Sequence, residues 1–397
     1  MAVIILKKRR KMQRKEEAKG MKVVVAIDSF KGSLSSIEAG NAVKNGILRC
    51  CPDAEVEICP LADGGEGTTE ALVCGLNGRL KTIQVTGPIY EPVIAQYGII
   101  DEVAVIEMAQ AAGLPQVPTE KRNPLVTTTY GVGEMIKACV ESGCKKFIIG
   151  IGGSATNDAG IGMLMALGYK FLDANGQEVV QGGQGLSQIV SIDASDVLPG
   201  LSSCEFKIAC DVTNPLYGEQ GAAYIYAPQK GATPEIVKTL DDGLRHFARV
   251  VEGDQKADFA NLPGAGAAGG LGFAFTAFLN GTLQSGVQMI LEETKLEEVL
   301  KGADYVLTGE GRLDHQTAMG KAPIGVAKLA KKYGCKVIGL AGATTKEATA
   351  CHKKGIDAYF SIVNHPMSLE EAMEPEVAFE NMKQTTEQIF NLIKAIK

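Results

Sequence analysis

Along residues 22–80, apolar and polar positions follow a pattern typical of strands that are followed by helices. The run from Lys22 to Ile27 predicts a buried strand, and residues 35–38 match an S-x-x-E capping box at the start of an amphipathic helix. A second strand is predicted from Glu55 to Pro60, and another helix follows Thr68. Strands that alternate with helices and end in polar loops indicate a parallel α/β sheet.

The pattern changes in the middle of the chain. Between Lys81 and Met108 apolar and polar residues alternate, with turn residues at 87–88 and 101–102, which predicts an antiparallel meander. Further strands are predicted at 147–151 and 206–209, each before a polar loop.

From about residue 286 the alternation of strand and helix returns. It predicts, in order, a helix at 292–301, a strand at 303–308, a helix at 323–333, a strand at 336–340 and a helix at 370–396. We therefore predict an α/β domain made of residues 21–80 and 286–397, with a mixed α/β domain of residues 81–285 inserted in it. Residues 1–20 are predicted to be a basic, disordered extension.

Charge narrows the class of partner. Residues 1–20 hold eight basic and two acidic side chains, so the acidic excess of the chain (formal net charge −6) lies entirely in residues 21–397. An acidic body argues against nucleic acid as a partner. The apolar run at Ala2–Leu6 precedes the basic residues and is too short for a signal peptide.

Two further features exclude a membrane protein and a disulfide framework. The stretch from Phe259 to Leu291 has no charged side chain, but glycines and Pro263 interrupt it, so no membrane span is expected. The ten cysteines include no C-x-x-C pair. Reduced thiols in a cytoplasmic protein are the interpretation we favour.

The segment Gly309–Asp314, followed by Gly320 and Lys321, carries the clearest chemical signal. We expect it to be a glycine-rich loop that follows a buried strand and presents Arg312, Lys321 and two carboxylates. Glycines let the backbone approach a ligand, and this set of charges suits a phosphorylated ligand with its metal. The alternative is a glycine turn with surface ion pairs.

Four other segments share this design of a strand followed by polar and glycine residues with an aspartate. They lie at 28–33, 63–67, 152–158 and 211–215. Ligands of open α/β sheets collect outside the carboxyl ends of the strands, where helix N-termini favour anions. Five such segments together predict a site for a charged small molecule.

Other catalytic patterns are absent or weak. The chain has no G-x-x-x-x-G-K-[ST] motif, and the G-x-G-x-x-G match at 264–269 follows Asn261-Leu262-Pro263 instead of a strand. Close packing of the backbone, or the approach of a ligand to it, explains these glycines better than dinucleotide binding. The four histidines show no catalytic pattern. Carboxylates and cations remain, and they suit phosphoryl transfer.

Taken together, the five segments resemble the glycerate kinases of the type I family, from Met21 almost to the C-terminus. The matching stretches include Asp28-Ser29-Phe30-Lys31-Gly32, Ala62 to Thr68, Gly152 to Asp158, Cys210 to Leu216, and Gly309 to Asp314 with Gly320-Lys321. The resemblance implies an ATP-dependent kinase that phosphorylates D-glycerate with Mg²⁺ in an interdomain cleft. It also implies two α/β domains, one of them flavodoxin-like and split by insertion of the other. Similarity favours 2-phosphoglycerate over 3-phosphoglycerate as product.

Roles for single residues follow from the resemblance as hypotheses. The candidate catalytic residues are Asp158 or Asp211 as base, with Lys31 and Arg312. Candidates for binding substrate or nucleotide are Ser29, Lys31, Gly64, Gly65, Gly153, Ser154, Asn157, Asn214, Gly309, Gly311, Arg312 and Lys321. Candidates for holding Mg²⁺ are Asp63, Glu66 and Asp314.

Three other functions stay open at this point. A kinase that forms 3-phosphoglycerate or acts on a related hydroxy acid would carry the same motifs. A nicotinamide-dependent dehydrogenase would use the glycine run at 264–269, and a non-catalytic sensor would bind glycerate without consuming ATP. Assembly into a homo-oligomer also stays open.

Overall fold

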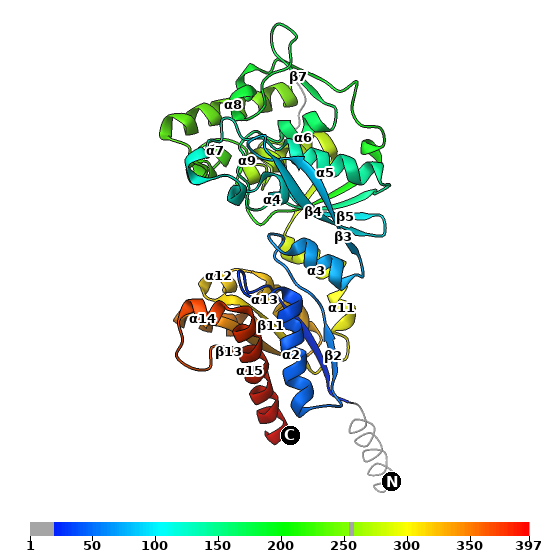
Figure 1. The fold of residues 1–397 in the computed structure, drawn as a ribbon, viewed down its shortest axis with the longest axis vertical. Coiled ribbons are helices and arrows are strands. Elements are labelled where there is room, and N and C mark those ends of the chain that lie inside the picture. The colour runs from blue at the N-terminus through cyan, green and yellow to red at the C-terminus, as the bar shows by residue number, and fades with distance from the viewer. Residues whose placement is uncertain (1–19, 254–257, 397) are drawn as a thin grey trace, which may run out of the picture. The chain divides into compact units, whose positions relative to one another are not determined.

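The computed structural model describes residues 20–253 and 258–396, and these residues form two compact units. The first unit runs up to Leu61 and resumes at Leu291, and the second unit is Ala62–Ile290 (Figure 1). The first unit is therefore split in sequence by the second. The disordered extension is predicted for residues 1–20. Of these, residues 1–19 lie outside the described residues, and only Gly20 is described.

The sheet of the first unit is entirely parallel, with strand order β13-β12-β11-β1-β2. Its strands are β1 (Lys22–Ile27), β2 (Glu55–Ile58), β11 (Tyr305–Leu313), β12 (Lys336–Thr344) and β13 (Ala358–Ser361). Counted along the chain this order is 5-4-3-1-2, which is the flavodoxin-like arrangement. The predicted fold class is confirmed.

Helices pack on this sheet through the apolar faces that the sequence predicts. Helix α2 (Ser36–Cys50) begins at the expected capping box, in which Ser35 and Glu38 bond each other's backbone N–H groups. It packs against α15 (Pro375–Ile396), and the two helices share a core with β1 (Figure 1). Helix α13 (Ala322–Lys332) contacts β11 and β12.

Strand β11 is longer than predicted and contains the segment expected to be a glycine-rich loop. The register pairs Glu310 with Ala341 and Arg312 with Ala343 of β12. A Cβ atom on Gly309 would lie 2.0 Å from the carbonyl oxygen of Leu340, so only glycine allows this pairing. The prediction of a loop was wrong because ladder pairing outweighs the low strand propensity of glycine.

Two predicted helices are each divided in the structure. The helix expected at 292–301 is α10 (Gly286–Glu293) and α11 (Leu296–Val299). The helix expected at 370–396 is α14 (Leu369–Met373) and α15, which are separated at Glu374. Pro375 disfavours helical geometry at the residue before it, which explains the second break.

The second unit contains a mixed six-stranded sheet of order β10-β9-β6-β5-β4-β3. Its strands are β3 (Arg79–Thr86), β4 (Pro92–Ile100), β5 (Val103–Glu107), β6 (Lys146–Gly150), β9 (Glu205–Ala209) and β10 (Thr282–Gln284). The pairs β3–β4 and β4–β5 are antiparallel, as the meander predicts, and β5, β6, β9 and β10 are parallel. Strands β7 (Lys170–Leu172) and β8 (Ser191–Asp193) form a separate hairpin.

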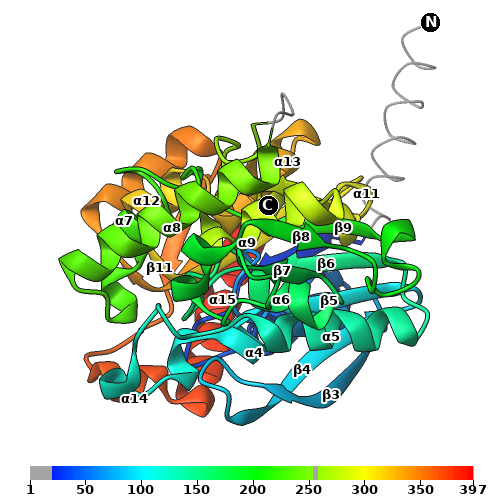
Figure 2. The same ribbon diagram turned by 90° about the horizontal axis from the view of Figure 1, so that it is seen from above.

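Helices of this unit pack around the six-stranded sheet, and α5 contacts β3 (Figure 2). Their bounds are α3 (Thr68–Gly75), α4 (Ala109–Ala112), α5 (Tyr130–Glu141), α6 (Ile161–Ala166), α7 (Ala222–Tyr226), α8 (Pro234–Glu252) and α9 (Ala267–Leu279). One large apolar core, rich in phenylalanine, joins helices α4 to α9 to the strands.

Residues 62–80 lie in the second unit, although the sequence pattern groups them with the first domain. Helix α3 contacts β4 and β5, and the carboxylate of Glu107, at the end of β5, accepts a hydrogen bond from Thr69 N at 2.8 Å. Residues 286–290 also lie in the second unit. The helix after β2 therefore covers a different sheet from the strand that precedes it.

Candidate active site

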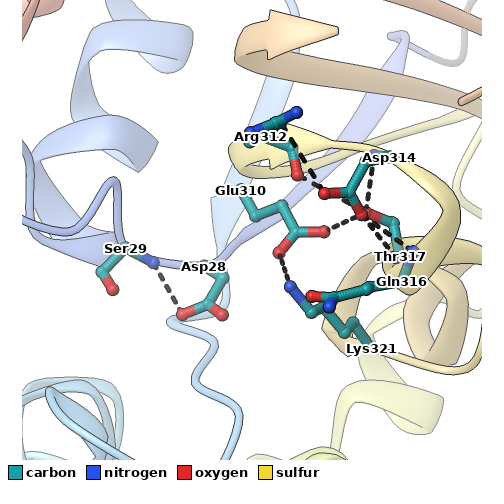
Figure 3. A network of polar contacts seen from close by, with 8 residues as sticks. All are labelled: Asp28, Ser29, Glu310, Arg312, Asp314, Gln316, Thr317 and Lys321. Carbon is teal, nitrogen blue, oxygen red and sulfur yellow. Dashed lines mark hydrogen bonds and ion pairs between the residues drawn. The ribbon is translucent and has the colours of Figure 1, made fainter. Parts of the chain in front are cut away.

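In the first unit, the candidate residues lie where β1 and β11 meet at the carboxyl ends of their strands. Asp28 N donates to Gly309 O at 2.9 Å, and the carboxylate of Asp28 accepts from Ser29 N at 2.7 Å (Figure 3). Lys31 follows in the same loop and is exposed. In a flavodoxin-like sheet, these two strands form the switch point at which ligands bind.

Glu310 is the centre of a polar network beside this switch point. Its side chain is buried and accepts a hydrogen bond from Thr317 Oγ1 at 2.5 Å and one from Lys321 Nζ at 3.5 Å (Figure 3). Burial raises the pKa of Glu310, and the bonds from Thr317 and Lys321 oppose that rise. Glu310 thus holds Lys321, whose side chain keeps 39% exposure and can still reach an anionic ligand.

Arg312 and Asp314 form an exposed ion pair on the same strand end. Arg312 Nε lies 3.7 Å from Asp314 Oδ2, and the arginine side chain is 65% exposed. Exposed pairs of this kind contribute only about 0–1 kcal/mol, so the guanidinium can exchange its partner for a phosphate or carboxylate at little cost.

Asp314 also begins helix α12 (His315–Ala318). Its Oδ1 accepts from Gln316 N at 2.8 Å and from Thr317 N at 3.3 Å. Burial raises the pKa of Asp314, but these N–H groups and nearby cations outweigh it and lower the pKa. One carboxylate oxygen is therefore committed to a helix cap and the other faces Arg312.

In the second unit, three of the predicted segments meet at the carboxyl ends of β6 and β9. A Cβ atom on Gly150 would lie 2.5 Å from Gly64 O, and one on Gly64 would lie 2.8 Å from the side chain of Ala209. Gly64 also has a φ of +87°, which favours glycine. The glycines of segment 63–67 thus let its backbone approach both strand ends.

Two carboxylates, Asp63 and Asp211, belong to this junction. Asp211 Oδ1 accepts from Gly286 N at 3.1 Å, and Asp63 Oδ1 accepts from Gly65 N at 2.9 Å. Loss of surrounding water raises the pKa of Asp211, and the charge of Asp63 raises it further. The charge of Asp63 thus contributes to the electrostatic environment of Asp211.

The remaining metal candidate of this unit, Glu66, is exposed on the same segment. Among the described residues, no group of three or more His, Cys, Asp or Glu side chains is arranged to hold a metal ion. Mg²⁺ bound with a nucleotide takes one or two carboxylates together with phosphate and water oxygens. Asp63, with Glu66 on the same segment, fits that smaller requirement.

Segment 152–158 has an exposed tip and a buried base. Gly152 and Gly153 are exposed, whereas Asn157 and Asp158 are fully buried. Asp158 Oδ2 accepts from Thr129 N and Thr129 Oγ1, both at 2.9 Å, and Oδ1 accepts from Gly160 N at 3.1 Å. Burial raises the pKa of Asp158 despite these bonds. Asp158 anchors the segment, and its carboxylate does not reach solvent.

The glycine run at 264–269 packs against this segment. Residues Ala268, Gly269 and Gly270 have φ values of 52°, 70° and 97°, and a Cβ atom on Gly269 would lie 2.1 Å from Thr156 O. No strand leads into the run, which lies at the start of α9. These glycines therefore allow close backbone packing, one of the two expectations from the sequence.

The side chain of Asn214 is hydrogen-bonded within its own loop in this structure. Its Nδ2 donates to Gln220 O at 2.8 Å, and Tyr226 Oη donates to its Oδ1 at 2.6 Å. Both ends of the amide are thus engaged by the segment between β9 and α8, so ligand binding by Asn214 would require an exchange of partners.

Sequence reasoning missed one charged residue of this region, Lys230. It ends the short helix η5 (Pro228–Lys230), and only 2% of it is exposed. Lys230 Nζ donates to Ser154 Oγ at 2.7 Å and to Thr156 O at 2.6 Å. Burial lowers the pKa of Lys230 to about 7, against the pull of Asp158. A lysine between Gln229 and Gly231 has the pattern of a surface turn, so the sequence contained no signal for it.

None of the helices in the described ranges, 20–253 and 258–396, is both long enough and apolar enough to cross a membrane.

Comparison with known proteins agrees with the motifs. The family model "Glycerate kinase family" matches residues 23–394. Glycerate kinase of Bacillus subtilis is 48% identical over 95% of this chain and 99% of its own length. Glycerate 2-kinase of Escherichia coli is 48% identical over 89% of this chain and 93% of its own.

A crystal structure agrees as well. It shows a protein of Salmonella typhimurium LT2 provisionally named glycerate kinase 2, which is 46% identical, with a TM-score of 0.88 over 95% of this chain and 99% of the other. With these matches over nearly its whole length, the chain is a kinase and belongs to the glycerate kinase family.

Proposed function

We propose that this protein transfers the γ-phosphoryl group of ATP to D-glycerate in the presence of Mg²⁺, with 2-phosphoglycerate as the favoured product. Membership of the glycerate kinase family and the similarity to the glycerate 2-kinase of E. coli support the reaction. The observation that carries the proposal is the pair of accessible cations, Arg312 and Lys321, at the β1/β11 switch point.

In this proposal the first unit binds anionic groups. Arg312 and Lys321 already pair with Asp314 and Glu310, so an incoming phosphate or carboxylate replaces an existing partner. Lys31 and Ser29 lie on the neighbouring loop after β1. The glycines at 309 and 311 keep the strand end free of side chains, which lets a ligand approach the backbone.

The second unit would contribute the metal-binding carboxylates. Asp63 is the first candidate because it lies at the junction of the predicted segments, and Glu66 is accessible on the same segment. Asp314 would bind the ion only by turning its Oδ2 away from Arg312. When bound, Mg²⁺ neutralises charge on the nucleotide phosphates.

Asp211 is the better candidate for the base that accepts the proton of the glycerate hydroxyl. It is exposed, so substrate can reach it, and loss of surrounding water raises its pKa, which makes it a stronger base. Asp158 is fully buried, and both of its oxygens accept protein hydrogen bonds. Segment 152–158 would instead bind through Gly153 at its exposed tip, with Ser154 and Asn157 behind it.

We also propose that the enzyme works in the cytoplasm. All ten cysteines are free thiols, which is typical of proteins from reducing compartments. The assembly state stays open.

The test is direct. Purified protein is incubated with ATP, Mg²⁺ and D-glycerate, and ³¹P NMR identifies the position of the new phosphate ester. We expect 2-phosphoglycerate, and L-glycerate serves as the control substrate. The 3-isomer would correct the position, whereas no ester at any pH between about 6 and 9 would refute the proposed reaction.

A further inference from the structure

We propose that Lys230 is a positioning residue that fixes segment 152–158 in the conformation needed for catalysis. The kinetic part of this inference rests on the proposed function, whereas its structural part does not. Lys230 is far from the segment in sequence, and it does not belong to any of the five motifs.

The contacts of Lys230 are concentrated on one segment. Its ammonium donates to the Ser154 hydroxyl at 2.7 Å and to the Thr156 carbonyl at 2.6 Å. These two residues directly follow the exposed pair Gly152–Gly153. Glycines have little conformational preference of their own, so the geometry of that tip depends on what holds the residues after it.

The location of the ammonium is costly, which argues for a specific role. Only 2% of Lys230 is exposed, and lysines are almost never buried to this degree unless they are paired. Asp158 is the charged group that acts on it, and it lies at the other end of the same segment. Arg122, on a neighbouring segment, donates its Nε hydrogen bond elsewhere, to Val117 O at 3.4 Å. Lys230 is thus hydrogen-bonded to the middle of segment 152–158 and attracted electrostatically to Asp158 at its end.

A second observation points to the same segment. The amide of Asn157 and the hydroxyl of Thr156 are fully buried, and neither has a hydrogen-bond partner within the described part of the chain. Buried polar groups are nearly always bonded, and exceptions concentrate at functional sites. Ala159 and Ala268 lie on the two segments that pack together here. Their left-handed φ values (49° and 52°) add local strain of the kind found at functional sites.

The test compares Lys230→Met, which keeps length but removes charge and donors, with Lys230→Arg, which keeps both. Lys121→Met is the matched control, because Lys121 is an exposed lysine of the same unit, paired only with Glu91 across 3.2 Å. Circular dichroism verifies the fold. The readouts are kcat/KM for D-glycerate between about pH 6 and 9, and hydrogen–deuterium exchange of peptides covering 152–158.

We expect Lys230→Met to lower kcat/KM by about 10- to 100-fold, since small misplacement of a binding element has effects of this size. Exchange in 152–158 should become faster, and Lys230→Arg should recover part of the activity. The parent enzyme should show a break in its pH profile near 7 that Lys230→Arg lacks, because a guanidinium stays protonated.

Two results would overturn the inference. One is a folded Lys230→Met variant whose kcat/KM matches that of Lys121→Met, with lowered thermal stability alone. The other is unchanged exchange in 152–158. If Lys230→Met does not fold, Lys230→Arg and the parent's pH profile decide. If the parent forms no phosphoglycerate, the proposed function fails, and the exchange experiment still judges Lys230.

Discussion

The two units differ in the exposure of their charged side chains. In the first unit Arg312 and Lys321 are 65% and 39% exposed, and their carboxylate partners lie at 3.7 and 3.5 Å. In the second unit Lys230 and Asp158 are buried and held by short hydrogen bonds to backbone and hydroxyl groups. Accessible pairs can exchange partners, whereas buried ones fix geometry. We infer that the first unit captures anions and that the second holds a preformed loop.

The largest test of this contrast compares two carboxylates of the second unit. We expect Asp211→Asn to lower kcat by about 100-fold or more, as loss of a general base typically does. The same change at Asp158 should leave kcat within about tenfold of the parent and lower stability instead, because that carboxylate has a structural role. Steady-state kinetics and denaturant unfolding separate the two effects. A reversal, with Asp158→Asn the less active variant, would return the role of base to Asp158.

The second test concerns the exchangeable cations. Arg312→Ala should lower kcat/KM by about 10- to 100-fold, because a hydrogen bond to a charged group contributes about 1.5–3 kcal/mol. Its thermal stability should stay near that of the parent, since the exposed pair with Asp314 contributes little. Arg49→Ala is the matched control, because Arg49 pairs with Glu387 at 3.5 Å in the same unit and is 55% exposed. Equal activity of the two variants would contradict a binding role for Arg312.

The third test measures the cost of burying Lys230. Its pKa falls from 10.5 to about 7 on folding, so above pH 7 the folded protein binds fewer protons than the unfolded chain. Stability therefore rises with pH over this range, by about 1.4 kcal/mol per pH unit. We expect the free energy of unfolding of the parent to increase relative to Lys230→Met between about pH 7 and 9, and to run parallel to it below pH 7. A constant difference would mean that folding does not lower the pKa of Lys230.

Much of the fold was readable in the sequence, because local patterns encode it. The capping box at Ser35, the strand from Lys22 and the antiparallel meander follow from spacing that neighbouring residues enforce. The five polar segments were also visible, since a strand followed by glycine and aspartate has a recognisable order. These features need no information about distant contacts.

The rest depends on contacts between residues far apart in the chain. Gly309 to Leu313 form a strand only because β12 pairs with them, and Asp158 is buried only because Thr129 lies over it. Lys230 shows the limit most clearly, because its partner Ser154 is separated from it by 76 residues. No local pattern distinguishes such a lysine from a solvated one.

The smallest test asks whether Asp314 is a helix cap alone or also a metal ligand. Asp314→Ala should lower the free energy of unfolding by about 1 kcal/mol, the usual effect of losing an N-cap. Ser35→Ala, which removes the cap of α2 in the same unit, should have a similar effect and leave activity unchanged. The distinguishing measurement is the Mg²⁺ concentration that gives half-maximal activity. Because Oδ1 of Asp314 is occupied by α12 and Oδ2 faces Arg312, we expect both variants to keep the parent's value. A rise of tenfold or more in Asp314→Ala alone, or about 1.4 kcal/mol in metal binding, would place a metal ligand in the first unit as well and weaken the division of roles between the units.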